Sequence, residues 1–363
     1  MICPHCERNL LRKERPGNRC SRCGRAYALD PKTNPLGLND LRVRRITAAL
    51  TDGGRIRIVP DQLWYALSRK RLRESTYAQG CAGVAFTVAG FATVVSVVAE
   101  APVVLLVSAA LLLIGLGIAV ARASGVGKGI PPVARGNFPA QVLGAWRQVY
   151  GALPPGVLDT AAPAVGSASP KDGAAPTGVL LCGDHAVLAF LVADGLPARH
   201  GLVPVRSPEE ARAVPSNGPV LVLRDTDADG ELLVRRVREA LPGRTVVDAG
   251  PPLRTVLALP QAVPYRDPRR KKPDPAVVER LAELGTFTPQ ELKWLGQGWR
   301  FPLVGLPPAR LLGVVDRVAG QLTRGVDADR RRAERLGFLT WPDPAGPGPV
   351  GPDPVGPDPV GGR

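Results

Sequence analysis

The sequence predicts a multidomain protein in which a small cysteine-rich unit, a pair of membrane-crossing helices, an α/β domain with a mostly parallel sheet and a small helical appendage follow one another. Three observations predict this order. Two C-x2-C pairs lie within the first 23 residues, the run 75–121 has Glu100 as its single charged residue, and strand-like and helix-like segments alternate over 178–250. The 363 residues leave room for two or three domains with at least one buried core.

Positive charge is concentrated at the N-terminus. Residues 1–73 hold 17 basic and six acidic residues, which is +11 of the net charge of +15. A basic arm on a nearly neutral body suits an anionic surface, either nucleic acid or lipid head groups. The 39 prolines and 41 glycines show no collagen-like period, so a fibrous protein is excluded and linkers and a disordered tail are expected.

The cysteine pairs predict a zinc site. Cys3 and Cys6 are separated from Cys20 and Cys23 by thirteen residues. Each pair can supply two thiolates to one tetrahedral Zn²⁺, and the metal provides folding energy that so short a segment lacks. The pattern resembles a zinc ribbon over about residues 1–30. Four thiolates leave no open position on the metal, so the expected role is structural, and disulfides are the alternative that a reducing cytoplasm disfavours.

The segment after the ribbon predicts a helix capped by Asn39 or Asp40, a short strand over 55–59, and a helix that begins at Asp61. Trp64 and Tyr65 in this second helix are interpreted as an anchor at a membrane interface. A winged-helix DNA reader is the alternative, disfavoured because the unit lacks a second wing strand. The basic residues that follow are the expected contacts with anionic head groups: Arg69, Lys70, Arg71 and Arg73.

The uncharged run predicts two transmembrane helices, 80–98 and 102–121, because each has about the 20 residues needed to cross a bilayer. Basic residues flank the pair but are absent from the turn at 100–102, which places both termini in the cytoplasm. A buried hairpin of a soluble protein is the alternative, but soluble helices need a polar face. Ribbon and hairpin together resemble uncharacterised membrane proteins of GC-rich bacteria, which implies a cell-membrane location and no activity.

The alternating region predicts parallel strands at 178–182, 201–205, 219–223 and 244–250, joined by helices. Ligands of such sheets bind beyond the carboxyl ends of the strands. Asp225, Asp227 and Asp229 follow the third strand, and carboxylates at alternate positions suit a divalent cation such as Mg²⁺. The alternative is a structural role in which Asp229 caps the next helix and the other two are turn residues.

Two other interpretations of this region are disfavoured. An EF-hand needs a glutamate at the twelfth loop position, which is Arg236, and a helix rather than a strand before the loop. A nucleophile pair of Cys182 and His185 lacks a third orienting group in the sequence.

The order of strands and helices with its D-x-D pair resembles a Toprim-type domain, a metal-dependent phosphoryl-transfer module. The resemblance places the metal-binding aspartates at Asp225 and Asp227 and the family's glycine at Gly183. The family's glutamate at the end of the first strand is replaced by Cys182. That replacement removes a metal ligand or the general acid–base, so a Toprim-like nuclease or nucleotide-processing enzyme is the alternative function rather than the leading one.

The C-terminal part predicts helices opened by Asp274 and by the capping box Thr288–Glu291, and a third helix over 309–323. The predicted division is a zinc ribbon (1–38), a basic juxtamembrane helix-strand-helix (39–74), a transmembrane hairpin (75–122), a helix and flexible linker (123–177), a Toprim-like α/β domain (178–260), a helical appendage (261–341) and a disordered Pro/Gly tail (342–363).

The leading hypothesis is a membrane-anchored, cytoplasm-facing zinc-binding scaffold or regulatory binding protein without catalytic activity. Its expected partners are an anionic bilayer and a protein that contacts the ribbon or the α/β domain, with nucleic acid as a weaker alternative because the ribbon has few aromatic residues for stacking. A transporter is disfavoured because two spans without an intramembrane charge provide no ion path.

Overall fold

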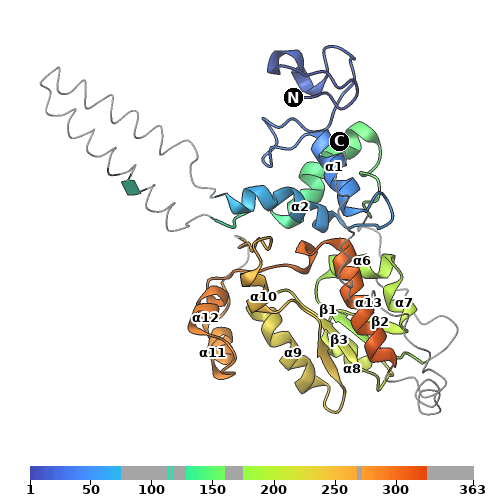
Figure 1. Cartoon of the computed structure of the whole chain (residues 1–363), viewed down its shortest axis with the longest axis vertical. Helices are drawn as coiled ribbons and strands as arrows, with labels where there is room; N and C mark the ends of the chain where they lie inside the picture. The colour runs from blue at the N-terminus through green and yellow to red at the C-terminus, as the bar shows by residue number, and fades with distance from the viewer. Residues whose placement is uncertain (75–112, 114–115, 118–127, 160–174, 268–271, 325–363) are drawn as a thin grey trace, which may run out of the picture.

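The computed structural model describes residues 1–74, 113, 116–117, 128–159, 175–267 and 272–324. The cysteine-rich segment lies at one end of the molecule, the helices α1 (Asp40–Leu50) and α2 (Pro60–Arg73) lie in the middle, and the α/β domain lies at the other end (Figure 1). The N-terminal segment and the α/β domain are therefore separated by two helices that the sequence assigns to neither.

The first 38 residues, all described, form loops with little regular structure. Their antiparallel pairing consists of the bridges Ile2–Asn9 and Arg19–Ala26, and their helical turns are η1 (Arg12–Glu14) and η2 (Pro16–Asn18). The buried apolar side chains of this segment's small hydrophobic cluster are Cys3, Leu10 and Cys20. A cluster this small cannot compensate for the chain's lost conformational entropy, so another source of stability is required.

The helix α1 begins where its cap predicts, whereas α2 begins at Pro60 after Val59, so Asp61 lies inside the helix and does not cap it. The Asn39 side chain accepts a hydrogen bond from the Arg42 amide at 2.8 Å and starts α1. The predicted strand over 55–59 is wrong: this stretch is a turn in which Ile58 alone forms a bridge, parallel to Val157. Alternation of arginine and isoleucine is insufficient for a strand without a neighbouring strand to pair with.

The predicted membrane anchor in α2 is also wrong. Trp64 is 0% and Tyr65 is 2% exposed. The Trp64 indole donates to the carbonyl of Val133 at 2.8 Å, and the Tyr65 hydroxyl donates to the carbonyl of Val263 at 3.0 Å. An apolar ring with one polar group suits a protein core as well as a bilayer interface, and here the core supplies the partners.

The two-pass membrane location requires correction. A search of the helices that the structure describes finds none that is both long enough and apolar enough to cross a bilayer. The predicted spans 80–98 and 102–121 lie outside the described residues, apart from 113, 116 and 117. Most of the linker before the sheet and the whole Pro/Gly tail also lie outside them.

The α/β domain has the predicted parallel sheet. Its strands are β1 (Gly178–Cys182), β2 (Leu202–Val205), β3 (Val220–Leu223) and β4 (Val246–Asp248), in the order β2-β1-β3-β4. All pairs are parallel. The connecting helices are α6 (His185–Ala193), α7 (Leu196–Arg199), α8 (Pro208–Ala213), α9 (Ala228–Ala240) and α10 (Leu253–Ala258).

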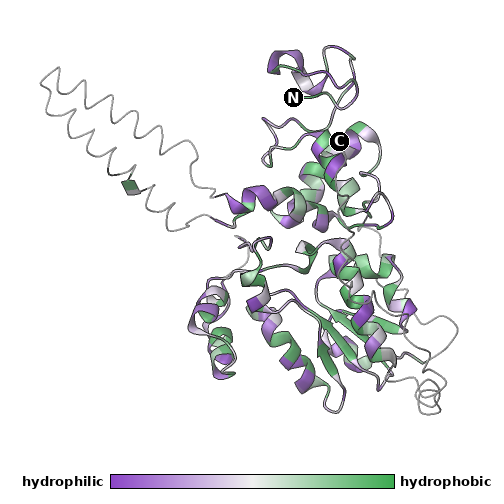
Figure 2. Ribbon diagram, in the orientation of Figure 1, coloured by the Kyte–Doolittle hydropathy of each residue, from purple (hydrophilic) through white to green (hydrophobic). Residues whose placement is uncertain are grey.

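The two central strands are buried on both faces, because alternate side chains point to opposite sides. Val179 and Val222 belong to the face covered by α8 and α9, with Ala211 and Val237 as their neighbours in that core. Leu180, Cys182, Leu221 and Leu223 belong to the opposite core. Strands with no polar face are typical of parallel sheets, and Figure 2 shows these strands in the hydrophobic colour.

The second core extends far beyond the sheet. It includes α6, residues of α1 and α2, and the segment formed by η3 (Arg135–Asn137), η4 (Pro139–Leu143) and α5 (Gly144–Tyr150). It also takes in η6 (Leu303–Gly305) and α13 (Pro308–Arg324), whereas α11 (Pro275–Glu283) and α12 (Pro289–Gly296) pack on α9. Segments that are far apart in sequence therefore share one apolar interior.

Candidate functional site

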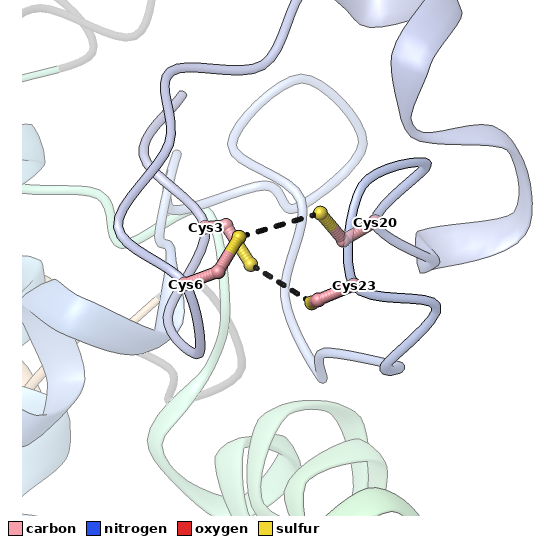
Figure 3. Close-up of side chains that lie close together, drawn as sticks. All are labelled: Cys3, Cys6, Cys20 and Cys23. Carbon is pink, nitrogen blue, oxygen red and sulfur yellow. Dashed lines mark hydrogen bonds between the residues drawn. The ribbon is translucent and has the colours of Figure 1, made fainter.

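The four cysteines of the N-terminal segment come together. Cys3 and Cys6 lie in the first knuckle, Cys20 and Cys23 lie in the second, and the four sulfurs lie within 4.8 Å of one another. Across the knuckles, the sulfurs of Cys3 and Cys23 are 3.9 Å apart and those of Cys6 and Cys20 are 3.8 Å apart (Figure 3). Of the residues described, this is the group of side chains that meets the distance requirement for a metal ion.

These distances fit a tetrahedral metal and do not fit disulfides. A Zn–S bond of about 2.3 Å in a tetrahedron separates two sulfurs by about 3.8 Å. A disulfide separates them by about 2.05 Å. The cysteines are free thiols, with Cys3 and Cys20 buried and Cys23 exposed. The arrangement can therefore hold one metal ion between the two knuckles.

The knuckle backbone favours the thiolate that a metal needs. Amides of Cys23 and Arg22 point at the sulfur of Cys20 and lower its pKa to about 7. For Cys6 the amide of Arg8 acts in the same direction, but burial and the three neighbouring thiols raise the pKa to about 11. Four sulfurs this close repel one another as anions, and a divalent cation relieves that repulsion.

His5 is a support for the knuckle and not a ligand. It lies between the two cysteines of the first pair and is half-buried. Its Nε2 is 2.8 Å from the carbonyl oxygen of Ala26, and its ring lies 6.0 Å from that of Tyr150. The imidazole thus connects the knuckle to the chain beyond the second pair and to α5.

Hydrogen bonds to α1 join the ribbon, residues 1–38, to the body, while Arg15 and Asp30 form a buried ion pair within the ribbon. Arg44 of α1 donates to the carbonyl of Pro4 at 3.3 Å. The fully buried carboxylate of Asp40 accepts the amides of Ala28 and Leu29, both at 2.8 Å, and the hydroxyl of Tyr150. The four-cysteine cluster is therefore held against α1 and α5.

The outer surface of the ribbon is basic. Arg15 is excluded from this surface because it is buried with Asp30, and Tyr27 is 1% exposed and provides no stacking platform. The exposed basic residues of segment 1–25, which we call the basic surface, are Arg8, Arg12, Lys13, Arg19, Arg22 and Arg25.

The predicted contacts with an anionic surface at the end of α2 are largely used within the protein. Arg69 donates to the carbonyl of Gln261 at 2.8 Å, and Arg73 donates to that of Pro260 at 3.2 Å. Arg71 pairs with Glu74 at 3.2 Å, while Lys70 is exposed. These arginines tie α2 to the loop after α10.

The three aspartates predicted as a cation site have three different surroundings. Asp227 caps α9 by accepting the Gly230 amide at 2.8 Å and pairs with Arg300. Asp225 accepts the Leu303 amide at 2.8 Å, and Asp229 is exposed. The helix cap is therefore Asp227 and not Asp229. Gly230 is required because a Cβ there would lie 2.2 Å from the carbonyl oxygen of Asp225.

A fourth carboxylate completes this edge of the sheet. Asp184, after β1, caps α6 and forms a two-pronged pair with Arg135, with N–O distances of 2.8 Å. Arg135 also contacts Asp61 of α2. A cavity of about 360 Å³ lies here, lined by Asp184, Asp225 and Arg300 among others.

Arginines pair with Asp184 and Asp227 at this edge, and burial opposes the charge of Asp225. Burial raises the pKa of Asp225, and the negative charges of Asp184 and Asp227 raise it further, to about 7. Although burial opposes the charge of Asp184, contact with Arg135 lowers its pKa below the ordinary value. Arg135 and Arg300 stand where a divalent cation would otherwise balance the carboxylates.

Cys182 is not placed to act as a nucleophile with His185. Cys182 is 0% exposed, its thiol points to the carbonyl of Asp184 at 3.6 Å, and burial raises its pKa well above the ordinary value. A reactive cysteine needs the opposite, an accessible and readily formed thiolate.

Comparison with family models, curated proteins and solved structures finds no match to this chain. Function therefore has to be inferred from the geometry of the metal centre and of the sheet edge.

Sequence reasoning missed Arg135 as the shared partner of Asp184 and Asp61. These residues come from three different segments, and local periodicity contains no information on such pairs. The one usable signal was the position of Asp184 just beyond a strand end, where parallel sheets collect polar side chains.

Proposed function

We propose that this chain is a zinc-binding scaffold protein that binds an acidic protein partner through the basic surface of its ribbon. The spacing of the four sulfurs supports Zn²⁺ as the metal, because two bridging distances of 3.8 and 3.9 Å match a tetrahedral thiolate site. With four protein ligands the ion has no open position, so its role is to fold the ribbon and to fix the orientation of the surrounding arginines.

The α/β domain in this proposal is a non-catalytic body. Its acidic residues at the sheet edge are engaged by Arg135, by Arg300 and by backbone amides, and its buried Cys182 occupies the position where the Toprim resemblance implies a glutamate. A metal-dependent nuclease would need these carboxylates to be available as ligands. This arrangement favours the scaffold over the nuclease.

The metal content of the purified protein tests the zinc site. We expect about one zinc per chain by elemental analysis, and loss of that zinc in Cys20→Ser because three thiolates bind the ion much less tightly than four. Cys182→Ala is the matched control, since it removes a cysteine outside the cluster and should leave the zinc content unchanged. Metal-free native protein with four reactive ribbon thiols would refute the proposal.

Binding of an acidic probe tests the basic surface. We expect a polyglutamate peptide to bind the zinc-loaded protein, and the double variant Arg22→Glu, Arg25→Glu to weaken binding by about tenfold or more through charge reversal. Arg235→Glu on the exposed side of α9 is the control with the ribbon intact. Equal affinity of all three proteins, or a preference for DNA over the peptide, would contradict an acidic protein as the partner.

A further inference from the structure

A cavity of about 620 Å³ lies beside the ribbon, between α1 and the end of α5, and no function above uses it. Thr47 and Thr51 line it from α1, and Trp146, Tyr150 and Leu153 line it from the α5 side. Sites for small organic molecules have volumes of about 300–1,000 Å³ and walls that are mainly apolar and aromatic. The size and lining of this cavity are those of such a site.

Two aromatic rings form one wall of the cavity. The ring centroids of Trp146 and Tyr150 are 4.6 Å apart, with 44° between the planes. The Tyr150 hydroxyl is already bonded to Asp40, so the contribution of this residue to a ligand is its ring. A flat apolar group is the shape that two neighbouring rings accommodate best.

One cation stands at the same wall. The guanidinium carbon of Arg44 lies 5.1 Å from the ring centroid of Tyr150 and 5.9 Å from that of Trp146. Among the described residues its side chain donates to the carbonyl of Pro4 at 3.3 Å and forms no ion pair within 4 Å. Asp40, one turn earlier in α1, is fully buried and directs its oxygens at two amides and the hydroxyl of Tyr150 rather than at Arg44.

A second polar group in the lining has no partner. Thr47 is 2% exposed, and its hydroxyl has no hydrogen-bond partner within the part of the chain that the structure describes. A buried hydroxyl without a partner is unfavourable, and a ligand atom that accepts or donates a hydrogen bond removes that penalty.

We propose that the cavity between α1 and α5 binds a small planar organic anion, with its ring against Trp146 and Tyr150 and its acidic group at Arg44. The charge of Arg44 selects an anion over a neutral or cationic ring, and the limited volume selects a small molecule over a polypeptide. This site is separate from the basic surface, so it provides the proposed scaffold with a means of responding to a metabolite.

Titration with anilinonaphthalene sulfonate, a planar aromatic anion, tests the proposal on the zinc-loaded full chain. We expect saturable binding at one site, followed by probe fluorescence. Ala48→Trp and Ala152→Trp fill the cavity from its opposite walls and should abolish binding. Arg44→Gln should weaken it by about tenfold. Arg45→Gln, which changes the next residue of α1 and does not line the cavity, should leave the affinity within about twofold.

Two further measurements test whether the negative charge of the probe is needed and whether the probe binds at Trp146. Phenylnaphthylamine has similar rings without the sulfonate, so we expect it to bind at least about tenfold more weakly than the anion. The indole N–H resonance of Trp146, assigned with Trp146→Phe, should shift saturably in the unaltered protein, which covers the case in which a filled-cavity variant fails to fold.

Unchanged binding in both filled-cavity variants, equal binding of the neutral probe, or an unmoved Trp146 resonance would each overturn the proposal. Zinc content and polyglutamate binding are measured on the same samples. If only the anion binding fails, the proposed scaffold function is unaffected. If the protein holds no zinc, the scaffold proposal itself is contradicted.

Discussion

Asp225 is a carboxyl group whose charge the surrounding structure opposes. It is half-buried just beyond the carboxyl end of β3, where burial and the charges of Asp184 and Asp227 raise its pKa from 3.8 to about 7. Asp184, which lines the same cavity, has the opposite pKa shift because Arg135 outweighs its burial. The two aspartates at one edge of the sheet thus have pKa shifts in opposite directions, because Arg135 pairs directly with Asp184.

The raised pKa of Asp225 predicts a definite pH dependence of stability. Between about pH 4 and pH 7 the folded protein keeps a proton on Asp225 that the unfolded chain releases, so the free energy of unfolding falls as the pH rises through this window. Asp225→Asn keeps an oxygen for the Leu303 amide and removes the charge. We expect it to stabilise the protein by about 2–4 kcal/mol at pH 8, and by little at pH 4.

Guanidinium denaturation at the two pH values measures this effect. Asp229→Asn in the first turn of α9 is the control, because Asp229 is exposed and its substitution should change stability by less than about 0.5 kcal/mol at either pH. Parallel pH profiles for the unaltered protein and Asp225→Asn would show that Asp225 is ionised in the folded state throughout.

At the level of secondary-structure elements, the buried carboxylate of Asp40 joins the ribbon to helix α1. Asp40 lies at the first position of α1, is 0% exposed, and accepts hydrogen bonds from Ala28, Leu29 and Tyr150. Hydrogen bonds to a charged acceptor are stronger than neutral ones, and a buried donor left without an acceptor is costly. The same residue therefore fixes the end of the ribbon and the position of α5.

Asp40→Asn should loosen this junction. Its amide NH₂ group would face a backbone N–H or the Tyr150 hydroxyl, so we expect a loss of about 2–4 kcal/mol in the free energy of unfolding and faster proteolysis between the ribbon and α1. Tyr150→Phe, which removes a single hydrogen bond, should cost about 1 kcal/mol. Equal effects of the two substitutions would mean that the amides of Ala28 and Leu29 contribute little.

Local signals in the sequence were sufficient for most helix starts and for the sheet. Asn39, Asp274 and Thr288 each accept the amide hydrogen bond that their cap position predicts. The four strands appear where short apolar runs predicted them, and the central strands β1 and β3 give the clearest runs because they are buried on both faces. The four-cysteine cluster was also predictable from local signals, because each cysteine pair has a fixed C-x2-C spacing.

Contacts between distant segments were not predictable from one sequence. Asp227 rather than Asp229 caps α9 because Arg300, more than seventy residues away, pairs with Asp227 and holds it at the helix start. The failed strand at 55–59 and the aromatic pair in α2 have the same cause. Each of these sequence patterns is compatible with two structures, and contacts with residues distant in the sequence determine which one forms.

At the scale of the whole molecule, α2 is an internal element of the body. Its Tyr65 ring packs edge-on against Phe301 with centroids 6.1 Å apart, and its Trp64 ring packs edge-on against Tyr265 at 5.3 Å. Both partners lie beyond the sheet in sequence, in the part predicted as a separate helical appendage. Because these rings are fully enclosed, a disturbance at this contact should be felt by the ribbon side and the sheet side together.

Gly305 in η6 provides the test of that coupling. A Cβ at this position would lie 2.8 Å from Cζ of Tyr65, a ring that has no room to move. We expect Gly305→Ala to destabilise the protein by about 1–3 kcal/mol and to lower the midpoint of thermal unfolding for a ribbon probe and a sheet probe by the same amount. Gly313→Ala in α13 is the matched control: a Cβ there meets no atom within 4 Å, and alanine favours the helix by about 0.5–1 kcal/mol. If Gly305→Ala shifts the sheet probe alone, α2 belongs with the ribbon as an independent unit. If both probes shift together while Gly313→Ala stabilises, the ribbon is anchored to the α/β domain through the Tyr65 contact, and the basic surface is held in one orientation relative to the sheet.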